Sequence, residues 1–170
     1  MKDWDTCLYP AFRDTIRGSY YGVIDKDMLD EECYYLACRA IAAFKFPHNS
    51  LEYTTYYTKT DPETGNSVST TNDDNDAIPH AYFNDDNVGY AEVSIIVAWM
   101  KVYWCERLMS NSNNYEDIYT DSNIKTFSKA NILDKWIKQY STYRTDAREL
   151  ESHYSRVSTE KKPAVGDINV

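Results

Sequence analysis

The sequence predicts a mainly α protein: a small helical bundle of about four helices, with a β-hairpin and loop inserted between the second and third helices. Two apolar, helix-like segments, residues 27–46 and 88–109, indicate the bundle. Between them, residues 50–87 hold almost no aliphatic side chains and eight acidic residues against one basic residue. We expect one helical domain at 1–157, with the insert at 50–87, and a flexible tail at 158–170.

The first two helices are predicted at residues 5–17 and 27–46. Asp5 or Thr6 is a suitable N-cap for the first helix and Gly18 a suitable end, although Pro10 interrupts the hydrogen-bond ladder of a helix interior. In the second segment the apolar residues recur at helical spacing along one face, and Pro47 ends the run.

The insert begins with residues 51–60, in which tyrosine and threonine dominate, as is typical of a strand. Residues 61–66 have the composition of a turn, so we expect a hairpin that pairs 51–60 with 66–72. An acidic loop at 73–87 follows, and three apolar side chains are expected to attach it to the core: Ile78, Tyr82 and Phe83.

The third helix, 88–109, is apolar nearly all round, with Asp85, Asp86 or Asn87 as its cap. Such a helix is buried by neighbours on several sides, which makes it either the core helix or part of a subunit interface. The last helix is predicted at about 129–157, with Ser128 as N-cap. Its apolar seam follows heptad spacing: Trp136, Tyr140, Tyr143, Ala147, Leu150, Tyr154 and Val157.

The net charge of −9 argues against a general duplex-DNA binder, which needs a clustered basic surface. The charge is uneven, because residues 125–162 hold nine Lys and Arg against five Asp and Glu, or +4, which leaves −13 for the rest. This polarity fits a subunit with different partners at its two ends, and it fits chance equally well. The sixteen tyrosines fit either an interface-rich protein or ordinary core and surface positions.

No catalytic or cofactor signature stands out, so we expect neither an enzyme nor a bound cofactor or metal. GxSxG, Walker A, GxGxxG and HExxH are all absent. The four cysteines lack metal-site spacing and indicate a reduced environment, and no apolar run predicts a signal peptide or membrane span. His48, His80 and His153 have no second ligand nearby in sequence, and the acidic cluster at 73–76 fails the calcium-loop pattern. The Lys and Arg side chains of the last helix alternate with acids, which indicates a solvent-exposed face.

The predicted elements follow in this order: a short N-terminal helix, a helix that ends in CRAIAAFKFP, the β-rich insert, a long apolar helix (AEVSIIVAWMKVYWCERLM) and a long last helix that starts from SKANILDKWIKQY. This order over residues 5–157 resembles the head–tail connector, or adaptor, proteins of tailed bacteriophages. These small helical subunits form the neck ring beneath the portal. The Asn-, Tyr- and Asp-rich composition is similar to that of virion proteins, including those of the crAss-like phages.

The resemblance implies a virion protein, assembled in the host cytoplasm as a homo-oligomeric ring commonly of twelve copies. It would join the portal protein to the tail or further neck proteins and line the DNA exit channel, with non-specific contact to passing DNA and none to a membrane. The C-terminal segment would dock on the portal through Lys161, Lys162, Pro163, Val165 and Ile168. The insert would meet the tail-side partner through Tyr53, Tyr56 and Tyr57, and its acids would border the channel: Asp73, Asp74, Asp76, Asp85 and Asp86.

Three alternatives stay open: another phage neck or tail-completion protein, a small helical interaction module, and an enzyme with a dispersed site.

Overall fold

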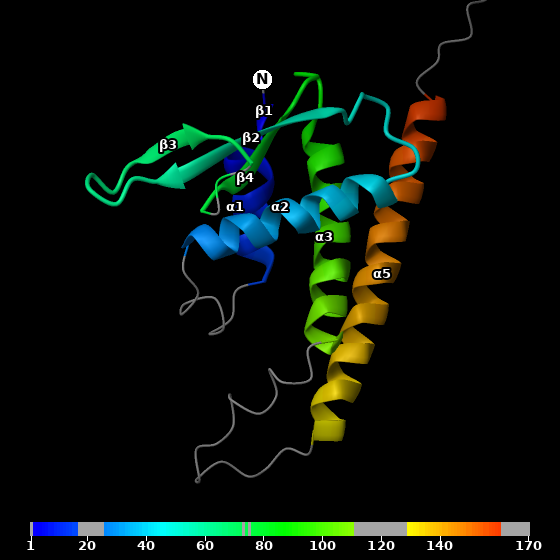
Figure 1. Ribbon diagram of the computed structural model, residues 1–170. Helices are drawn as coiled ribbons and strands as arrows, with labels where there is room; N and C mark the ends of the chain where they lie inside the picture. The colour runs from blue at the N-terminus through cyan, green and yellow to red at the C-terminus, as the bar shows by residue number, and fades with distance from the viewer. Residues whose placement is uncertain (1, 17–25, 73, 75, 111–128, 161–170) are drawn as a thin grey trace, which may run out of the picture.

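The computed structural model describes residues 2–16, 26–72, 74, 76–110 and 129–160. Within them, four helices and a four-stranded antiparallel sheet are arranged as Figure 1 shows. The mainly helical fold class and the β insert between the second and third helices are confirmed. The elements are β1 (Lys2–Asp3), α1 (Trp4–Thr15), α2 (Lys26–Ala43), β2 (Tyr53–Thr60), β3 (Ser67–Thr70), β4 (Ile78–Phe83), α3 (Tyr90–Ser110) and α5 (Lys129–Glu160).

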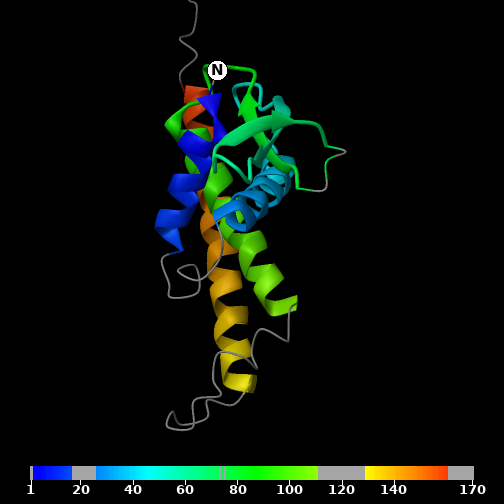
Figure 2. The same cartoon turned by 60° about the vertical axis from the view of Figure 1, so that its left-hand side comes forward.

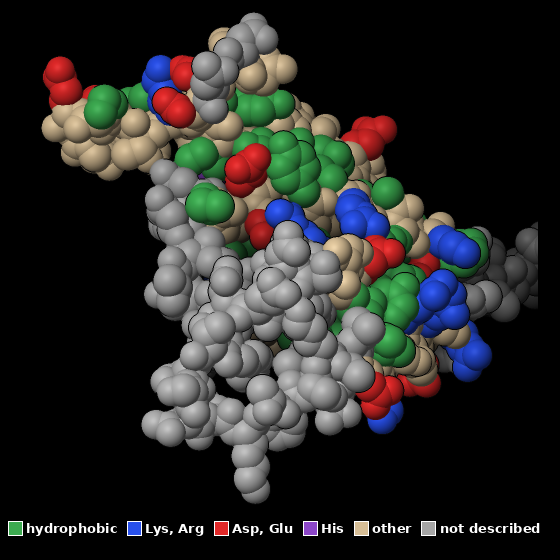
Figure 3. All heavy atoms as spheres, turned by 60° about the horizontal axis from the view of Figure 1, so that its bottom comes forward, with side chains coloured by type: hydrophobic (Ala, Val, Ile, Leu, Met, Phe, Trp, Pro, Cys, Tyr) green, Lys and Arg blue, Asp and Glu red, His purple; other side chains and the backbone are tan. Residues whose placement is uncertain are grey.

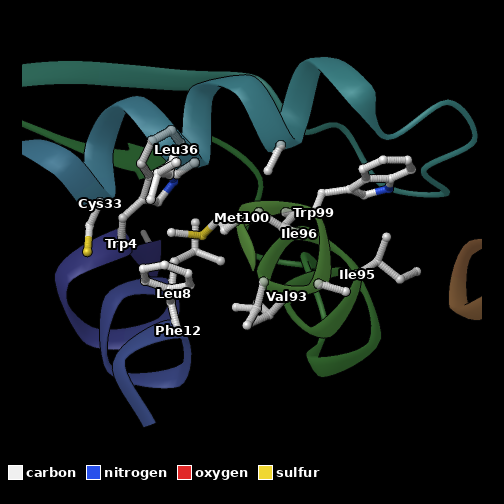
Figure 4. Close-up of a cluster of buried hydrophobic side chains, with 14 of the residues drawn as sticks. Trp4, Leu8, Phe12, Cys33, Leu36, Val93, Ile95, Ile96, Trp99 and Met100 are labelled. Atoms are coloured by element: carbon white, nitrogen blue, oxygen red, sulfur yellow. The ribbon is translucent and has the colours of Figure 1, made fainter. Parts of the chain in front are cut away.

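Helix α3 is the core helix of the fold. It packs against α1, α2 and α5, and residues on every side of it are buried. Figure 4 shows side chains of α1 and α2 meeting those of α3, with Met100 among them. Ile96 and Met100 are fully excluded from solvent. The apolar composition of this segment is therefore explained by packing within the chain.

Helices α3 and α5 lie side by side and run in opposite directions (Figures 1 and 2). Trp136 packs edge-on against Trp104 with 5.6 Å between ring centroids, and Ala147 further along the seam is fully buried. Leu150, predicted to belong to this seam, is instead 46% exposed, and Glu151 is buried in its place. A straight helix drifts away from a strict seven-residue repeat, so the next buried position after Ala147 lies four residues on.

A buried carboxylate joins the beginning of α3 to the far end of α5. Glu92 is 3% exposed and accepts hydrogen bonds from the Gly89 N–H (2.7 Å), Asn49 Nδ2 (2.6 Å) and the Tyr154 hydroxyl (2.5 Å). The His48 ring stacks on Tyr154 with 4.0 Å between centroids. Burial alone would raise the pKa of Glu92, but the hydrogen bonds outweigh it and hold the pKa below its usual value.

The sheet has the strand order β1-β4-β2-β3, with every neighbouring pair antiparallel. The predicted hairpin is confirmed, because Tyr57 pairs with Thr70 and Thr60 with Ser67. Its turn contains Gly65 at φ +69°, in the left-handed region that favours glycine. Trp4 of α1 packs on the sheet, with its ring 4.7 Å from that of Tyr53, and so joins the insert to the helical core.

The prediction that residues 78–83 belong to a loop was wrong. They form β4, the strand between β1 and β2, and Phe83 is fully buried while Ile78 and Tyr82 are partly buried. Pro79 hid the strand in the sequence, because proline has no backbone N–H to donate to a neighbouring strand. The structure accommodates it because β1 pairs only with Tyr82 and Phe83, which leaves Pro79 beside a single neighbouring strand.

Several predicted helix ends also shift. The side chain of Asp3, rather than Asp5 or Thr6, caps α1 by accepting the Asp5 N–H at 3.1 Å. Helix α2 ends at Ala43, four residues before Pro47. The Glu92 carboxylate accepts the Gly89 N–H just before α3, and so takes the capping role that was predicted for residues 85–87. Helix α5 runs three residues past the predicted 157. The predicted Gly18 and Ser128 ends lie outside the described residues.

Candidate partner-binding surfaces

A groove of about 510 Å³ opens where the chain leaving α2 meets α3 and α5. Its walls combine aromatic and basic side chains. Phe46, just after α2, is 63% exposed, whereas Trp99 of α3 is 9% exposed. Six of its lining residues carry most of its chemical character: Phe46, Trp99, Tyr103, Arg144, Arg148 and Glu151.

One residue of the groove wall, Trp99, carries a buried hydrogen-bond donor, Nε1, without a partner among the described residues. A buried donor without a partner costs about 1–3 kcal/mol, so nearly all such groups in folded proteins are paired.

The groove is also basic. Lys45, Arg144 and Arg148 contribute three positive charges, and Glu151 contributes one negative charge. The Glu151 carboxylate is already engaged, since it accepts the Lys45 N–H at 2.6 Å. A second hollow continues along α5 past Arg148 to Arg156. The arrangement suits a ligand that brings carboxylate groups together with some apolar surface.

The tip of the β2–β3 hairpin, residues 61–66, has the opposite character. Both its acids, Asp61 and Glu63, are charged groups at the surface, and Glu63 is exposed. The Asp61 carboxylate accepts the Glu63 N–H and the Thr64 hydroxyl, each at 2.9 Å. These two bonds lower the pKa of Asp61, which keeps it ionised and the turn ordered.

The five acids predicted to border a channel do not gather at one place. Asp74 and Asp76 precede β4, whereas Asp85 and Asp86 follow it, and a six-residue strand spans about 20 Å. Asp74 is paired with Lys59 at 2.5 Å, and Asp85 accepts the Asn87 N–H at 2.8 Å. The remaining acid of this set, Asp73, lies outside the described residues.

The tyrosines predicted to meet a partner are partly buried. The Tyr53 hydroxyl donates to Cys38 Sγ at 3.4 Å and its ring packs on Trp4, while the Tyr56 hydroxyl donates to Asp3 at 3.0 Å. Tyr57 is half-buried on the same strand. Tyr53 and Tyr56 therefore hold the sheet on α1. The five C-terminal docking residues lie outside the described range: Lys161, Lys162, Pro163, Val165 and Ile168.

One histidine has partners that the sequence did not suggest. His80 Nδ1 lies 2.9 Å from the Asp5 carboxylate, and Nε2 lies 2.9 Å from the Thr58 hydroxyl. A carboxylate, an imidazole and a hydroxyl in this order also form nucleophilic triads. Here Tyr56 stacks on the imidazole, with ring centroids 5.3 Å apart, and none of the four residues lines either hollow. The group joins α1 to strands β2 and β4.

Metal binding and thiol chemistry depend on how the His, Cys, Asp and Glu side chains of the described residues are grouped and buried. No group of three or more His, Cys, Asp or Glu residues there is arranged to hold a metal ion. All four cysteines are free thiols, and burial raises the pKa of Cys33 and Cys105 to about 11, which keeps both protonated.

Among the described helices, none combines the length and apolar character that crossing a membrane requires.

No protein-family model matches the sequence, and comparisons with curated proteins and with solved structures give no match either.

Proposed function

We propose that this protein is a structural subunit of a homo-oligomeric ring in the neck of a tailed phage, between the portal and the tail. The observation that best supports this proposal is the presence of two unlike surfaces on one core. The β2–β3 hairpin, with its acidic tip, projects from one side, and α5 lies at the other (Figure 1). Basic residues of α5 line the groove. Unlike surfaces that contact each other head to tail generate a ring when the rotation between subunits closes.

The way α3 is packed supports a rigid body. It is in contact with α1, α2 and α5, and Trp4 connects this core to the sheet. Interactions spread over all these elements keep the hairpin and the groove in a fixed relative orientation. A fixed orientation between two contact surfaces is what a closed ring needs, since the same rotation must repeat from subunit to subunit.

The charge of the chain also suits a DNA conduit. A net charge of −9 repels the phosphate backbone, whereas a basic lumen would retain it. Asp76 and Asp86 are both exposed on the insert. In the proposed ring, acids of the insert border the channel and let the genome pass with only non-specific contact.

The experiment that tests this function combines the purified chain with the portal ring encoded by the same phage genome. Light scattering gives the mass of the complex, and electron microscopy gives its symmetry. We expect a ring stacked coaxially on the portal. A chain that stays monomeric and does not bind the portal contradicts the proposal and favours a small interaction module.

A matched pair of variants tests the predicted C-terminal docking segment. Lys161→Glu with Lys162→Glu reverses two charges there, whereas Lys135→Glu with Lys138→Glu reverses two charges on α5. We expect only the first pair to weaken portal binding, while both keep the circular dichroism of the wild type. Equal weakening by both pairs would mean that overall charge drives the association.

A further inference from the structure

We propose that the tip of the β2–β3 hairpin, residues 61–66, inserts into the α2–α3–α5 groove of the next copy of this chain. The inference deepens the proposed function and rests on it, because it names the contact between neighbouring subunits. The occupant of the groove is therefore a second copy of the chain, and its chemistry is that of an acidic turn.

The tip is built to enter a groove. Residues 62–69 are all exposed, while the strands behind them are held in register from Tyr57–Thr70 to Thr60–Ser67. The Asp61 N–H donates to the Asn66 carbonyl at 2.9 Å, which closes the turn. A turn that is already ordered loses little conformational entropy on binding.

The groove offers the groups that such a tip lacks. The exposed Glu63 carboxylate matches the guanidinium groups of Arg144 and Arg148, which can bind a carboxylate through two parallel hydrogen bonds. The Trp99 ring adds aromatic surface to the groove wall, against which the turn can pack. Phe46, 63% exposed at the rim, would be covered by the strands of the hairpin.

The placement of the two surfaces favours a ring over a dimer. The hairpin projects from one side of the molecule and α5 lies at the other (Figure 1). In Figure 3 acidic side chains mark the hairpin end, with some basic surface beside them, and Lys and Arg side chains gather at the opposite end with acids among them. A contact between two different surfaces leaves one of each unused at the ends of every chain of subunits, so association continues, and it ends in a ring where the rotation from subunit to subunit closes.

The test uses two charge reversals of the full chain, Glu63→Arg at the tip and Arg148→Glu in the groove. Each variant alone places like charges across the contact, and we expect the dissociation constant for self-association to rise about tenfold or more. The control Glu52→Arg reverses an exposed acid away from the tip and should associate as the wild type does. Sedimentation equilibrium measures the masses, and circular dichroism checks the fold of each variant.

An equimolar mixture of the two variants is the decisive measurement. In the mixture, the tip of the Glu63→Arg variant meets the groove of the Arg148→Glu variant, which restores opposite charges. The other contact pairs the unchanged tip of the second variant with the unchanged groove of the first, as in the wild type. We expect the mixture to recover association that neither variant shows alone. Reversals that leave association unchanged, or a mixture that stays dissociated, would overturn the inference.

Failure of this contact is distinguishable from failure of the proposed function. If the wild type binds the portal but the reversals do not alter the number of bound copies, the function stands and the contact does not. If association depends on Glu63 and Arg148 but the portal is not bound, the contact stands and the neck role does not. A wild type that is monomeric both alone and with the portal contradicts both.

Discussion

Replacing Glu92 with glutamine tests whether one buried carboxylate holds the two long helices together. The substitution keeps the size of the side chain but exchanges one oxygen for an NH₂ group. Glu92 accepts donors on both oxygens, from Gly89 on one and from Asn49 and Tyr154 on the other. In either orientation of the amide, its NH₂ group faces one of these donors and cannot accept from it. The hydrogen bonds that remain are then made to a neutral oxygen and no longer to a carboxylate.

The expected loss of stability follows from the number of hydrogen bonds that Glu92 accepts. A hydrogen bond to a charged group contributes about 1.5–3 kcal/mol, so losing one such bond and weakening the others should lower the free energy of unfolding by about 2–3 kcal/mol. For a chain of this size, about 2–4 °C of melting temperature accompanies each kcal/mol, which gives a drop of about 4–12 °C. Urea denaturation at pH 7 measures the first quantity and calorimetry the second.

The pH dependence separates a lost charge from a general loss of packing. Because the folded pKa of Glu92 lies below its unfolded value of about 4.3, the stabilisation is present above that pH. It is lost as the pH falls through the lowered pKa, so the difference between wild type and Glu92→Gln should shrink below about pH 4. A double-mutant cycle with Tyr154→Phe should show coupling. A loss below about 0.5 kcal/mol, which is the range of ordinary surface substitutions, would refute the reasoning.

Two further predictions concern the sheet. Phe83→Ala empties a fully buried position on β4 and should lower the free energy of unfolding, measured in urea, by about 3–5 kcal/mol. The control Val68→Ala, on the exposed hairpin, should lower it by less than about 0.5 kcal/mol. Similar losses for both variants would mean that β4 is not part of the core. Gly65→Ala should cost about 1–2 kcal/mol through its left-handed backbone alone, because the new Cβ meets nothing within 4 Å. Gly65→Asn should cost less, since asparagine tolerates that conformation, and an alanine variant as stable as the wild type would contradict the turn geometry.

Patterns that depend on neighbouring residues predicted the fold class well. Helical spacing located α2, α3 and α5 to within a few residues, and the turn between 61 and 66 predicted the hairpin. These features could be predicted because helix periodicity and turn chemistry are local. The all-round apolar character of α3 also indicated its central position, which its contacts with three helices confirm.

Features that depend on distant pairing could not be predicted. A two-residue strand at Lys2 carries no periodic signal, and without it the strand character of 78–83 was hidden by Pro79. His80 and Asp5 are 75 residues apart, so no spacing rule brings them together. Glu92 was the one feature with a detectable signal, since an acid within a nearly all-apolar helix implies either a capping role or a buried partner.

The pairing of Lys2 and Asp3 with β4 has a consequence for the order in which the chain folds. The Lys2 ammonium group donates to the Val88 carbonyl at 2.7 Å, across 86 residues of chain. Closing so long a loop costs entropy that local hairpins and helix pairs do not incur. During synthesis α1 emerges before β4 and α3, so its buried side chains, Trp4, Leu8 and Phe12, have only α2 and β2 to pack on until then. The first helix to be made is therefore expected to be among the last to reach its place.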